Sequence, residues 1–469
     1  MSFRHRFDPT SLREYDIRGI VGESLTQDDA YAIGRTFGSM VARAGGSTVT
    51  IGYDGRLSSP ALEHALGAGA MASGMTVLRI GRGPTPMLYF AATTLGADGA
   101  IMVTGSHNPP DHNGFKMVLG HRPFFGEQIR ELGRLAASGD VVAETSGTMR
   151  DVNVIPAYVD RLLRDWNGTD RPLDVVWDSG NGAAGEILSL LVKRLPGRHR
   201  LLNAEIDGTF PAHHPDPTVL ANLGQLIAAV REEGADLGLA FDGDADRLGV
   251  VDNTGTVLWA DQLLVILARD ILRDHAGATV IADVKASQTL FEEIDRAGGT
   301  PLMWKSGHSP IKMKMAETGA PLAGEMSGHF FFADHWYGFD DGLYAALRLL
   351  AIVSHLKGPL SDVRLSLPAA VSTPELRFAC PDTRKFAVIA EVAARLERSG
   401  ACVSTIDGVR VTTPDGWWLL RASNTQAVLV ARAEGTSAAG LERLKTAITA
   451  QLEASGLRAP DFSGTAALH

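Results

Sequence analysis

The sequence predicts an α/β protein of several domains, and three observations lead to this fold class. The chain has 469 residues, whereas one hydrophobic core rarely grows beyond about 250–300 residues, so roughly three domains are expected. Apolar residues make up 45% of the chain and charged residues 21%, as in a folded globular protein. One strand–loop–helix pattern also recurs three times, which favours related α/β domains over one large sheet.

Each repeat opens with a predicted strand that runs into an aspartate. The strands and aspartates are Thr48–Tyr53 with Asp54, Leu173–Trp177 with Asp178, and Thr279–Ala282 with Asp283. A loop and a helix follow in each case, and the expected helices are Ala61–Ser73, a helix from Glu186, and Gln288–Ala297. The first and third repeats return to a second strand, at Met75–Ile80 and Pro301–Trp304, as a βαβ crossover does.

The pattern changes after Leu367–Pro368. The elements expected beyond this point are strands at Val409–Val411, Gly416–Arg421 and Val428–Ala433 and helices at Thr383–Ser399 and Ser437–Glu453. Strands clustered between two helices predict an α+β fold. We therefore expect four domains, at residues 1–151, 152–253, 254–367 and 368–469.

Composition excludes several classes of protein. The 44 Lys and Arg against 54 Asp and Glu give a net charge of −10, and no basic stretch predicts a nucleic-acid footprint. The two cysteines, Cys380 and Cys402, exclude a disulfide scaffold and suit a cytoplasmic protein. Met1–Arg13 has no apolar core typical of a signal peptide, and the apolar stretches are too short for a membrane span. A monomer is expected, with a dimer as the alternative.

Three aspartates on alternate positions, Asp242, Asp244 and Asp246, follow the predicted strand Leu237–Phe241. Alternate residues of an extended chain point to one side, so the three carboxylates converge and need a hard cation such as magnesium, calcium or manganese. An EF-hand loop is excluded, because its required glycine and glutamate are absent. A solvated acidic turn is the other alternative. The adjacent Arg247 suggests that a phosphate shares the metal.

Ser106 lies in a tight loop, Thr104–Pro110, after the predicted strand Gly99–Val103. Gly105 permits an unusual turn, and the two prolines prevent a helix from continuing. This is not a hydrolase nucleophile elbow, which needs glycines two residues on either side of the serine. His107 is awkwardly placed as a base for its neighbour. A structural turn and a serine that carries a phosphoryl group beside the metal loop both remain open.

Two further motifs suit a phosphorylated sugar. Glu325, Ser327 and His329 alternate in a glycine-flanked segment, where a carboxylate can accept hydrogen bonds from two sugar hydroxyls. Arg421–Thr425 brings a guanidinium, two hydroxyls and an amide together after a strand, which suits a phosphate. An ordinary polar turn is the alternative for each. The segment Gly338–Gly342 has no role that the sequence assigns.

These four motifs together resemble the α-D-phosphohexomutase superfamily. Thr104–Pro110 resembles its phosphoserine loop and Asp242–Arg247 its metal loop. Glu325–His329 resembles its sugar loop and Arg421–Thr425 its phosphate loop. The resemblance covers essentially the whole chain, and further matching segments are Arg13–Gly19, Asp178–Asn181, Phe210–Pro217 and Lys305–His308. The form of the sugar loop is similar to that of the bacterial phosphomannomutase/phosphoglucomutase branch.

The resemblance implies three similar α/β domains and a fourth, TATA-binding-protein-like domain around a central cleft. It implies one Mg2+ held by Asp242, Asp244 and Asp246 with the phosphate of Ser106. The catalytic residues it implies are Ser106, His107, Lys116, Arg247, His308 and His329. The substrate-binding residues it implies are Tyr15, Arg18, Lys285, His308, Glu325, Ser327, His329, Arg421, Ser423, Asn424 and Thr425. Gln426–Ala427 departs from the usual phosphate loop, and its effect on phosphate affinity is open.

The activity implied is the reversible interconversion of hexose 6-phosphates and hexose 1-phosphates. Phospho-Ser106 gives its phosphoryl group to the free end of the sugar, and the 1,6-bisphosphate of glucose or mannose is then both intermediate and activator. Candidate bases are His308, His329, Lys116 and Arg247. Glucose and mannose differ only at C2, so both are accepted if Glu325 and Ser327 bind the 3- and 4-hydroxyls. Alternatives are a phosphoglucosamine mutase, a metal-dependent sugar phosphatase, or a sugar-phosphate sensor without turnover.

Overall fold

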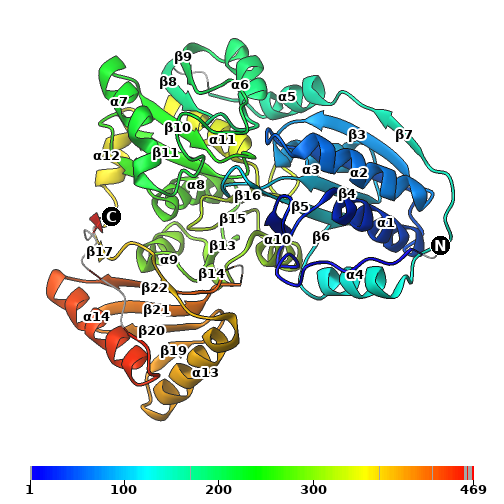
Figure 1. The fold of residues 1–469 in the computed structure, drawn as a ribbon. Coiled ribbons are helices and arrows are strands. Elements are labelled where there is room, and N and C mark those ends of the chain that lie inside the picture. The colour runs from blue at the N-terminus through cyan, green and yellow to red at the C-terminus, as the bar shows by residue number, and fades with distance from the viewer. Residues whose placement is uncertain are drawn as a thin grey trace. The chain divides into compact units, whose positions relative to one another are not determined.

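The computed structural model describes residues 3–168, 171–368, 370–424, 426–458, 462 and 467–468. These form four α/β domains, each built on its own sheet (Figure 1). The chain divides into two compact units. Unit 1 is Met1–Leu258 with Met315–Glu317 and Ser327–Val363, and unit 2 is Trp259–Lys314 with Thr318–Met326 and Arg364–His469. The four-domain fold is thus confirmed, whereas the exact boundaries drawn from the sequence stay a prediction.

The elements of unit 1 before residue 259 belong to two sheets. The first sheet and its helices are β1 (Ile17–Ile20), α1 (Gln27–Arg43), β2 (Thr48–Tyr53), α2 (Ser59–Ala72), β3 (Thr76–Arg82), α3 (Thr85–Thr94), β4 (Gly99–Val103), β5 (His112–Leu119), β6 (Arg122–Phe124), α4 (Glu127–Ser138) and β7 (Thr148–Asp151). The second set is α5 (Ile155–Arg164), β8 (Leu173–Asp178), α6 (Gly185–Leu191), β9 (Gly197–Leu202), α7 (Gly224–Glu233), β10 (Leu237–Phe241), β11 (Leu248–Asp252) and β12 (Val257–Leu258).

The remaining elements complete the chain. The third set is α8 (Ala260–Asp274), β13 (Thr279–Asp283), α9 (Gln288–Arg296), β14 (Thr300–Trp304), α10 (His308–Thr318), β15 (Leu322–Gly324), β16 (Phe330–Phe332), α11 (Gly342–Ser354) and α12 (Leu360–Leu365). The fourth is β17 (Val371–Ser372), β18 (Leu376–Ala379), α13 (Asp382–Arg398), β19 (Cys402–Ser404), β20 (Val409–Thr413), β21 (Gly416–Ala422), β22 (Val428–Gly435), α14 (Ala438–Glu453) and β23 (Ala467–Leu468).

The first three sheets share one arrangement of parallel strands, which confirms the predicted repeat. In each, the first strand of the repeat lies between the next two and pairs with both in parallel. The three orders are β3–β2–β4, β9–β8–β10 and β14–β13–β15. The Ser106 loop, the metal loop and the sugar loop therefore occupy one topological position, directly after the third strand of their repeats. Carboxyl ends of strands are where open α/β sheets place their sites.

Local sequence explains where several of these helices begin and end. Thr26 caps α1 with its side chain, which accepts a hydrogen bond from the Asp29 backbone N–H, and the Asp29 carboxylate accepts one from the Thr26 backbone N–H in return. Such a capping box satisfies two backbone donors at the start of a helix. Pro60 stands in the first turn of α2, where its missing N–H costs nothing. Gly139 ends α4 in the left-handed conformation.

The fourth sheet is antiparallel, as the α+β prediction requires. Along β21, Trp418 and Leu420 join the core that α13 and α14 cover, while Trp417 and Leu419 pack with Val284. This alternation is the period of two that a strand with two buried faces gives. The face with Trp417 therefore packs against the loop after β13 in the same unit.

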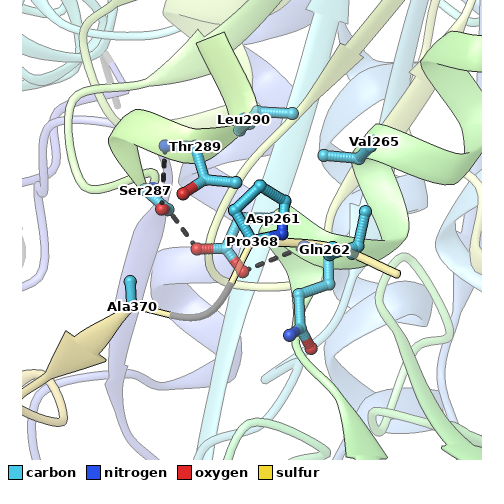
Figure 2. A pocket seen from close by; sticks show the side chains of 9 residues that line it. Asp261, Gln262, Val265, Ser287, Thr289, Leu290, Pro368 and Ala370 are labelled. Carbon is cyan, nitrogen blue, oxygen red and sulfur yellow. Dashed lines mark hydrogen bonds between the residues drawn. The ribbon is translucent and has the colours of Figure 1, made fainter. Parts of the chain in front are cut away.

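No helix in the described part of the chain is long and apolar enough to cross a membrane. A small pocket in unit 2 lies beside the start of α9 (Figure 2). Its lining residues are Asp261, Gln262, Val265, Ser287, Thr289, Leu290, Leu367, Pro368 and Ala370. None of these residues belongs to the four motifs.

Candidate active site

Ser106 stands in the loop between β4 and β5 and points at the metal loop. Its backbone is in the left-handed region, with φ 50°, which is uncommon for any residue but glycine. Its side chain is buried, and its Oγ donates a hydrogen bond to Asp242 Oδ2 at 2.8 Å. The predicted phosphoryl carrier thus touches the predicted metal loop.

Asp242, Asp244 and Asp246 are all fully buried, and one carboxylate oxygen of each lies within 4.8 Å of the others. Burial, together with the charges of Asp246 and Asp244, raises the pKa of Asp242 well above its ordinary value. Asp244 Oδ1 has no hydrogen-bond partner among the described residues. Buried carboxylates of this kind are costly without a cation, and three oxygen donors suit Mg2+. The residues present therefore fit the predicted metal.

Two residues of the first domain contact these aspartates. The Lys116 ammonium donates to Asp244 Oδ2 at 2.7 Å and also to Asp246 Oδ2. Burial alone would lower the pKa of Lys116, but the two carboxylates raise it well above its ordinary value. Thr85, the first residue of α3, donates its hydroxyl to Asp244 Oδ2 at 2.5 Å and its backbone N–H to Asp244 O at 2.9 Å. Asp244 is thus held in place from two sides.

Arg247 and His329 form the second side of this cluster. Arg247 Nε lies 3.7 Å from Asp242 Oδ2 and donates to His329 Nε2 at 3.4 Å. His329 Nε2 lies 3.2 Å from Asp246 Oδ1, and its Nδ1 lies 2.9 Å from Ser327 Oγ. A backbone bridge also joins Arg247 and His329. Two motifs that the sequence separates by about 80 residues therefore meet within unit 1.

His107 and Arg18 adjoin the Ser106 loop. Ser106 Oγ lies 3.3 Å from His107 Nδ1, so the neighbouring imidazole does reach the hydroxyl. Burial and the cations Arg247, Arg18 and Lys116 lower the pKa of His107 well below its ordinary value. Arg18 donates to Asn108 Oδ1 at 2.9 Å and to Asp16 at 2.5 Å. Tyr15 lies two residues before β1.

A second group of predicted residues gathers in unit 2. Glu325 is buried and accepts a hydrogen bond from the Gly307 N–H at 2.5 Å, beside His308 at the start of α10. Lys285 Nζ lies 3.1 Å from Glu375 Oε2 and 3.6 Å from Asp283 Oδ2. Burial alone would lower the pKa of Lys285, but these two carboxylates raise it.

The loop that follows β14 connects this group to the phosphate loop. The hydroxyl of Ser306 donates to Asp283 Oδ2 at 2.8 Å, and its backbone N–H donates to Asp407 Oδ2 at 3.0 Å. Arg421 Nε donates to the same Asp407 oxygen at 3.0 Å. Chain segments from three strands of unit 2 are therefore joined through Ser306 and Asp407.

The phosphate loop itself is held at its base. Ser423 Oγ accepts the Gln426 N–H at 3.2 Å, and Lys385 donates to the carbonyl oxygens of Ser423 and Gln426 at 2.5 and 2.9 Å. Asn424 lies next to Ser423 in the loop, and Thr425 lies outside the described residues. The loop that carries the unusual Gln426–Ala427 pair is thus fixed by a buried lysine.

Sequence reasoning missed several residues that hold these loops. In unit 1 these are Asp54, Arg56 and Thr85. In unit 2, Arg410 donates to the carbonyl oxygens of Val284 and Ala286 at 2.7 and 2.8 Å, and Arg432 donates to that of Lys285 at 2.8 Å. One signal was available, because Asp54–Arg56 and Asp283–Lys285 both place a basic residue two positions after the strand-ending aspartate. Nothing in the sequence marks Thr85, Arg410 or Arg432.

Comparisons with known families match four successive regions of the chain. The family described as "Phosphoglucomutase/phosphomannomutase, alpha/beta/alpha domain I" matches residues 9–140. Domains II and III of the same description match residues 156–255 and 259–370, and its C-terminal domain matches residues 375–451. The four motifs lie within these regions.

Similar individual proteins cover nearly the whole chain. A phosphomannomutase/phosphoglucomutase of Pseudomonas aeruginosa is 46% identical over 447 residues, which span 95% of this chain and 96% of the relative. A phosphoglucomutase of Neisseria gonorrhoeae is 46% identical over 94% of this chain and 96% of its own length. The crystal structure of a phosphoglucomutase/phosphomannomutase family protein from Burkholderia thailandensis superposes with a TM-score of 0.90 at 44% identity, covering 98% of this chain and 99% of that one.

Proposed function

Because the chain belongs to the phosphoglucomutase/phosphomannomutase family, we propose that it interconverts the 6- and 1-phosphates of mannose and glucose by phosphoryl transfer from Ser106. The observation that supports this mechanism best is the hydrogen bond from Ser106 Oγ to Asp242. It places the Ser106 hydroxyl, on a stiff loop, against a buried cluster of carboxylates. A structural turn would not need that contact.

The metal loop would hold Mg2+ through Asp242, Asp244 and Asp246, and the ion would neutralise charge on the transferring phosphoryl group. The chain's own cations add to this. Lys116 and Arg247 lie against these aspartates and can also bind phosphate oxygens. The candidate bases for the sugar hydroxyl are His308, His329, Lys116 and Arg247.

The remaining predicted residues would bind the sugar and its second phosphate. Glu325 and Ser327 would accept and donate hydrogen bonds to the hydroxyls that glucose and mannose share, with Lys285 beside Glu325. Arg421, Ser423, Asn424 and Thr425 would bind the phosphate that is not reacting. The hexose 1,6-bisphosphate is then the intermediate, and added bisphosphate restores phosphate to Ser106.

Replacing Ser106 with alanine tests the phosphoryl carrier. We expect the S106A variant to lose sustained mutase activity on glucose 1-phosphate and mannose 1-phosphate, because no side chain can then accept and return the group. Binding of the sugar phosphates should persist. Intact-protein mass after incubation with glucose 1,6-bisphosphate should rise by one phosphate in the wild type, mapped to Ser106, and not in S106A.

Full activity in S106A, or a phosphate mapped to another residue, would exclude this mechanism. The release of inorganic phosphate separates a mutase from a metal-dependent sugar phosphatase. A mutase conserves phosphate, whereas steady release at the rate of sugar conversion would favour the phosphatase. An assay with glucosamine 6-phosphate tests the phosphoglucosamine mutase alternative. Conversion of this substrate in preference to the phosphates of glucose and mannose would favour that alternative.

A further inference from the structure

We propose that Arg56 is a positioning residue that holds the Ser106 loop in its reactive conformation; this proposal rests on the phosphoryl-carrier role of Ser106. Arg56 lies between β2 and α2 and is 1% exposed. It is the second residue after Asp54, at the carboxyl end of β2. The Ser106 loop follows β4, the strand paired with β2, so the two loops emerge side by side.

The guanidinium of Arg56 donates four hydrogen bonds to backbone oxygens in and just after this loop. Nη2 donates to Ser106 O at 2.8 Å and to Asn108 O at 2.6 Å. Nη1 donates to Pro109 O at 2.5 Å and to His112 O at 3.0 Å. A planar group with five donors can satisfy such a set, whereas a lysine ammonium has three donors at a single atom. The loop therefore folds around one side chain.

Asp54 completes this arrangement from the other side of the guanidinium. Its Oδ2 lies 3.2 Å from Arg56 Nε and accepts hydrogen bonds from the Thr104 hydroxyl at 2.8 Å and the Gly105 N–H at 3.1 Å. The Thr104 hydroxyl in turn accepts the Ser106 N–H at 2.9 Å. Both peptide groups that flank the Ser106 side chain are thus bonded into the Asp54–Arg56 pair, directly or through Thr104.

The hydrogen bonds from Asp54 and Arg56 hold a strained backbone at Ser106. Ser106 occupies the left-handed region at φ 50°, which a serine adopts only at an energetic cost and only where its surroundings enforce it. Gly105 is required for the close approach, because a Cβ there would lie 2.4 Å from the Arg56 Cζ. Its own φ is outside the left-handed region, so space for Arg56 is what restricts this position.

The third repeat shows that this role is specific to Arg56. Lys285 stands at the corresponding place, two residues after Asp283 at the end of β13, but its amine faces carboxylates of Glu375 and Asp283 rather than backbone oxygens. Arg410 and Arg432 donate to carbonyl oxygens of Val284, Lys285 and Ala286, the segment that carries Lys285 itself. The basic residue two positions after the strand-ending aspartate therefore holds the Ser106 loop in the first repeat and pairs with carboxylates in the third.

The test compares Arg56→Lys with a matched control, Arg35→Met. Arg35 is also buried in the first domain, where it donates to Ser73 Oγ at 2.7 Å and Val142 O at 2.6 Å. We expect R56K to lose about a hundredfold in kcat with KM changed by less than about threefold, because a displaced nucleophile loses rate and not substrate binding. Transfer of phosphate from glucose 1,6-bisphosphate to Ser106, followed by mass in a single turnover, should slow by the same factor.

The R35M control should have a lower thermal midpoint than the wild type but should keep the wild-type kcat per folded molecule. If R56K does not fold, Gly105→Ala tests the same contact from the loop side and should show the same separation of kcat from KM. The proposal is wrong if R56K or G105A keeps kcat within about threefold, or if R35M loses kcat to the same extent. An active S106A variant would instead refute the proposed function, so the two failures are distinguishable.

Discussion

Thr85 illustrates at the scale of one residue how the metal loop is held. Its hydroxyl and backbone N–H both bond Asp244, and residues that orient metal ligands typically contribute 10–100-fold to metal affinity. We expect Thr85→Val to weaken Mg2+ binding about tenfold, because Asp244 keeps its backbone contact but loses a side-chain donor. Calorimetric titration of the purified enzyme with Mg2+ measures this.

Thr36→Val is the matched control for that substitution. Thr36 is equally buried in the same domain, and its hydroxyl has no hydrogen-bond partner among the described residues. Its replacement should leave Mg2+ affinity unchanged. Equal affinity in T85V and the wild type would show that Thr85 packs against the loop without orienting Asp244.

The residues of the candidate site differ in how readily the sequence alone identifies them. The alternation of the three aspartates indicated a cation site, with a solvated acidic turn as the alternative, and the position of Ser106 after a buried strand left a structural turn open. Lys116 entered only through the resemblance, because its contact with Asp246 spans 130 positions of the chain. His329 was found through its alternation with Glu325 and Ser327, but its contact with Asp246, 83 positions away, was not. Thr85 could not be found, since a threonine at the start of a helix is ordinary and its partner is 159 residues away.

At the scale of elements, the start of α11 packs directly against the metal loop. The Gly342 N–H donates to Ala245 O at 3.1 Å, and a Cβ at Gly342 would lie 2.7 Å from Arg247 O and 2.9 Å from Ala245 O. Backbone oxygens cannot move aside as a side chain can. We expect Gly342→Ala to displace the metal loop and lower both Mg2+ affinity and kcat, measured by titration and by mutase assay.

Gly224→Ala provides the comparison for that variant. Gly224 is also the first residue of its helix, its φ is −56°, and a Cβ there meets nothing within 4 Å. A glycine-to-alanine change at such a site typically stabilises by about 0.4–1 kcal/mol through the unfolded state. Loss of Mg2+ affinity in G224A, or none in G342A, would contradict the role given to the α11 start.

Strands were the elements that the sequence predicted best. β2, β4 and β10 begin and end where their apolar runs predicted, because each is largely buried and none contains a charged residue. The role of Gly338–Gly342 could not be predicted, because Asp341 caps α11 and Gly342 fits against the metal loop only in the folded chain.

At the scale of the whole molecule, the repeated pattern predicted three similar domains and the change of pattern after Leu367–Pro368 predicted a fourth, and the strand order that the first three sheets share confirms the repeat. The division into two units was not predictable. The chain passes between the units at several points, one of which falls within the sugar loop, between Met326 and Ser327, and no composition change or proline-rich linker marks that point in the sequence. Packing between domains depends on surfaces formed by distant segments, which local patterns do not encode.

The stability of the folded chain should depend on pH through one buried carboxylic acid, Asp341. Asp341 is fully buried, accepts the Tyr158 hydroxyl at 2.7 Å and the Tyr344 N–H at 2.9 Å, and burial raises its pKa to about 7. An unfolded aspartate has a pKa of about 3.9, so between these values the folded state binds the extra proton and its stability falls as pH rises.

Asp341→Asn keeps the helix cap but has no proton to lose. Thermal midpoints should therefore show the wild type losing about 2 kcal/mol relative to D341N between about pH 5.5 and about pH 7. Asp295→Asn, at an exposed position, should instead run parallel to the wild type, and a D341N profile that also runs parallel would mean that Asp341 is ionised throughout.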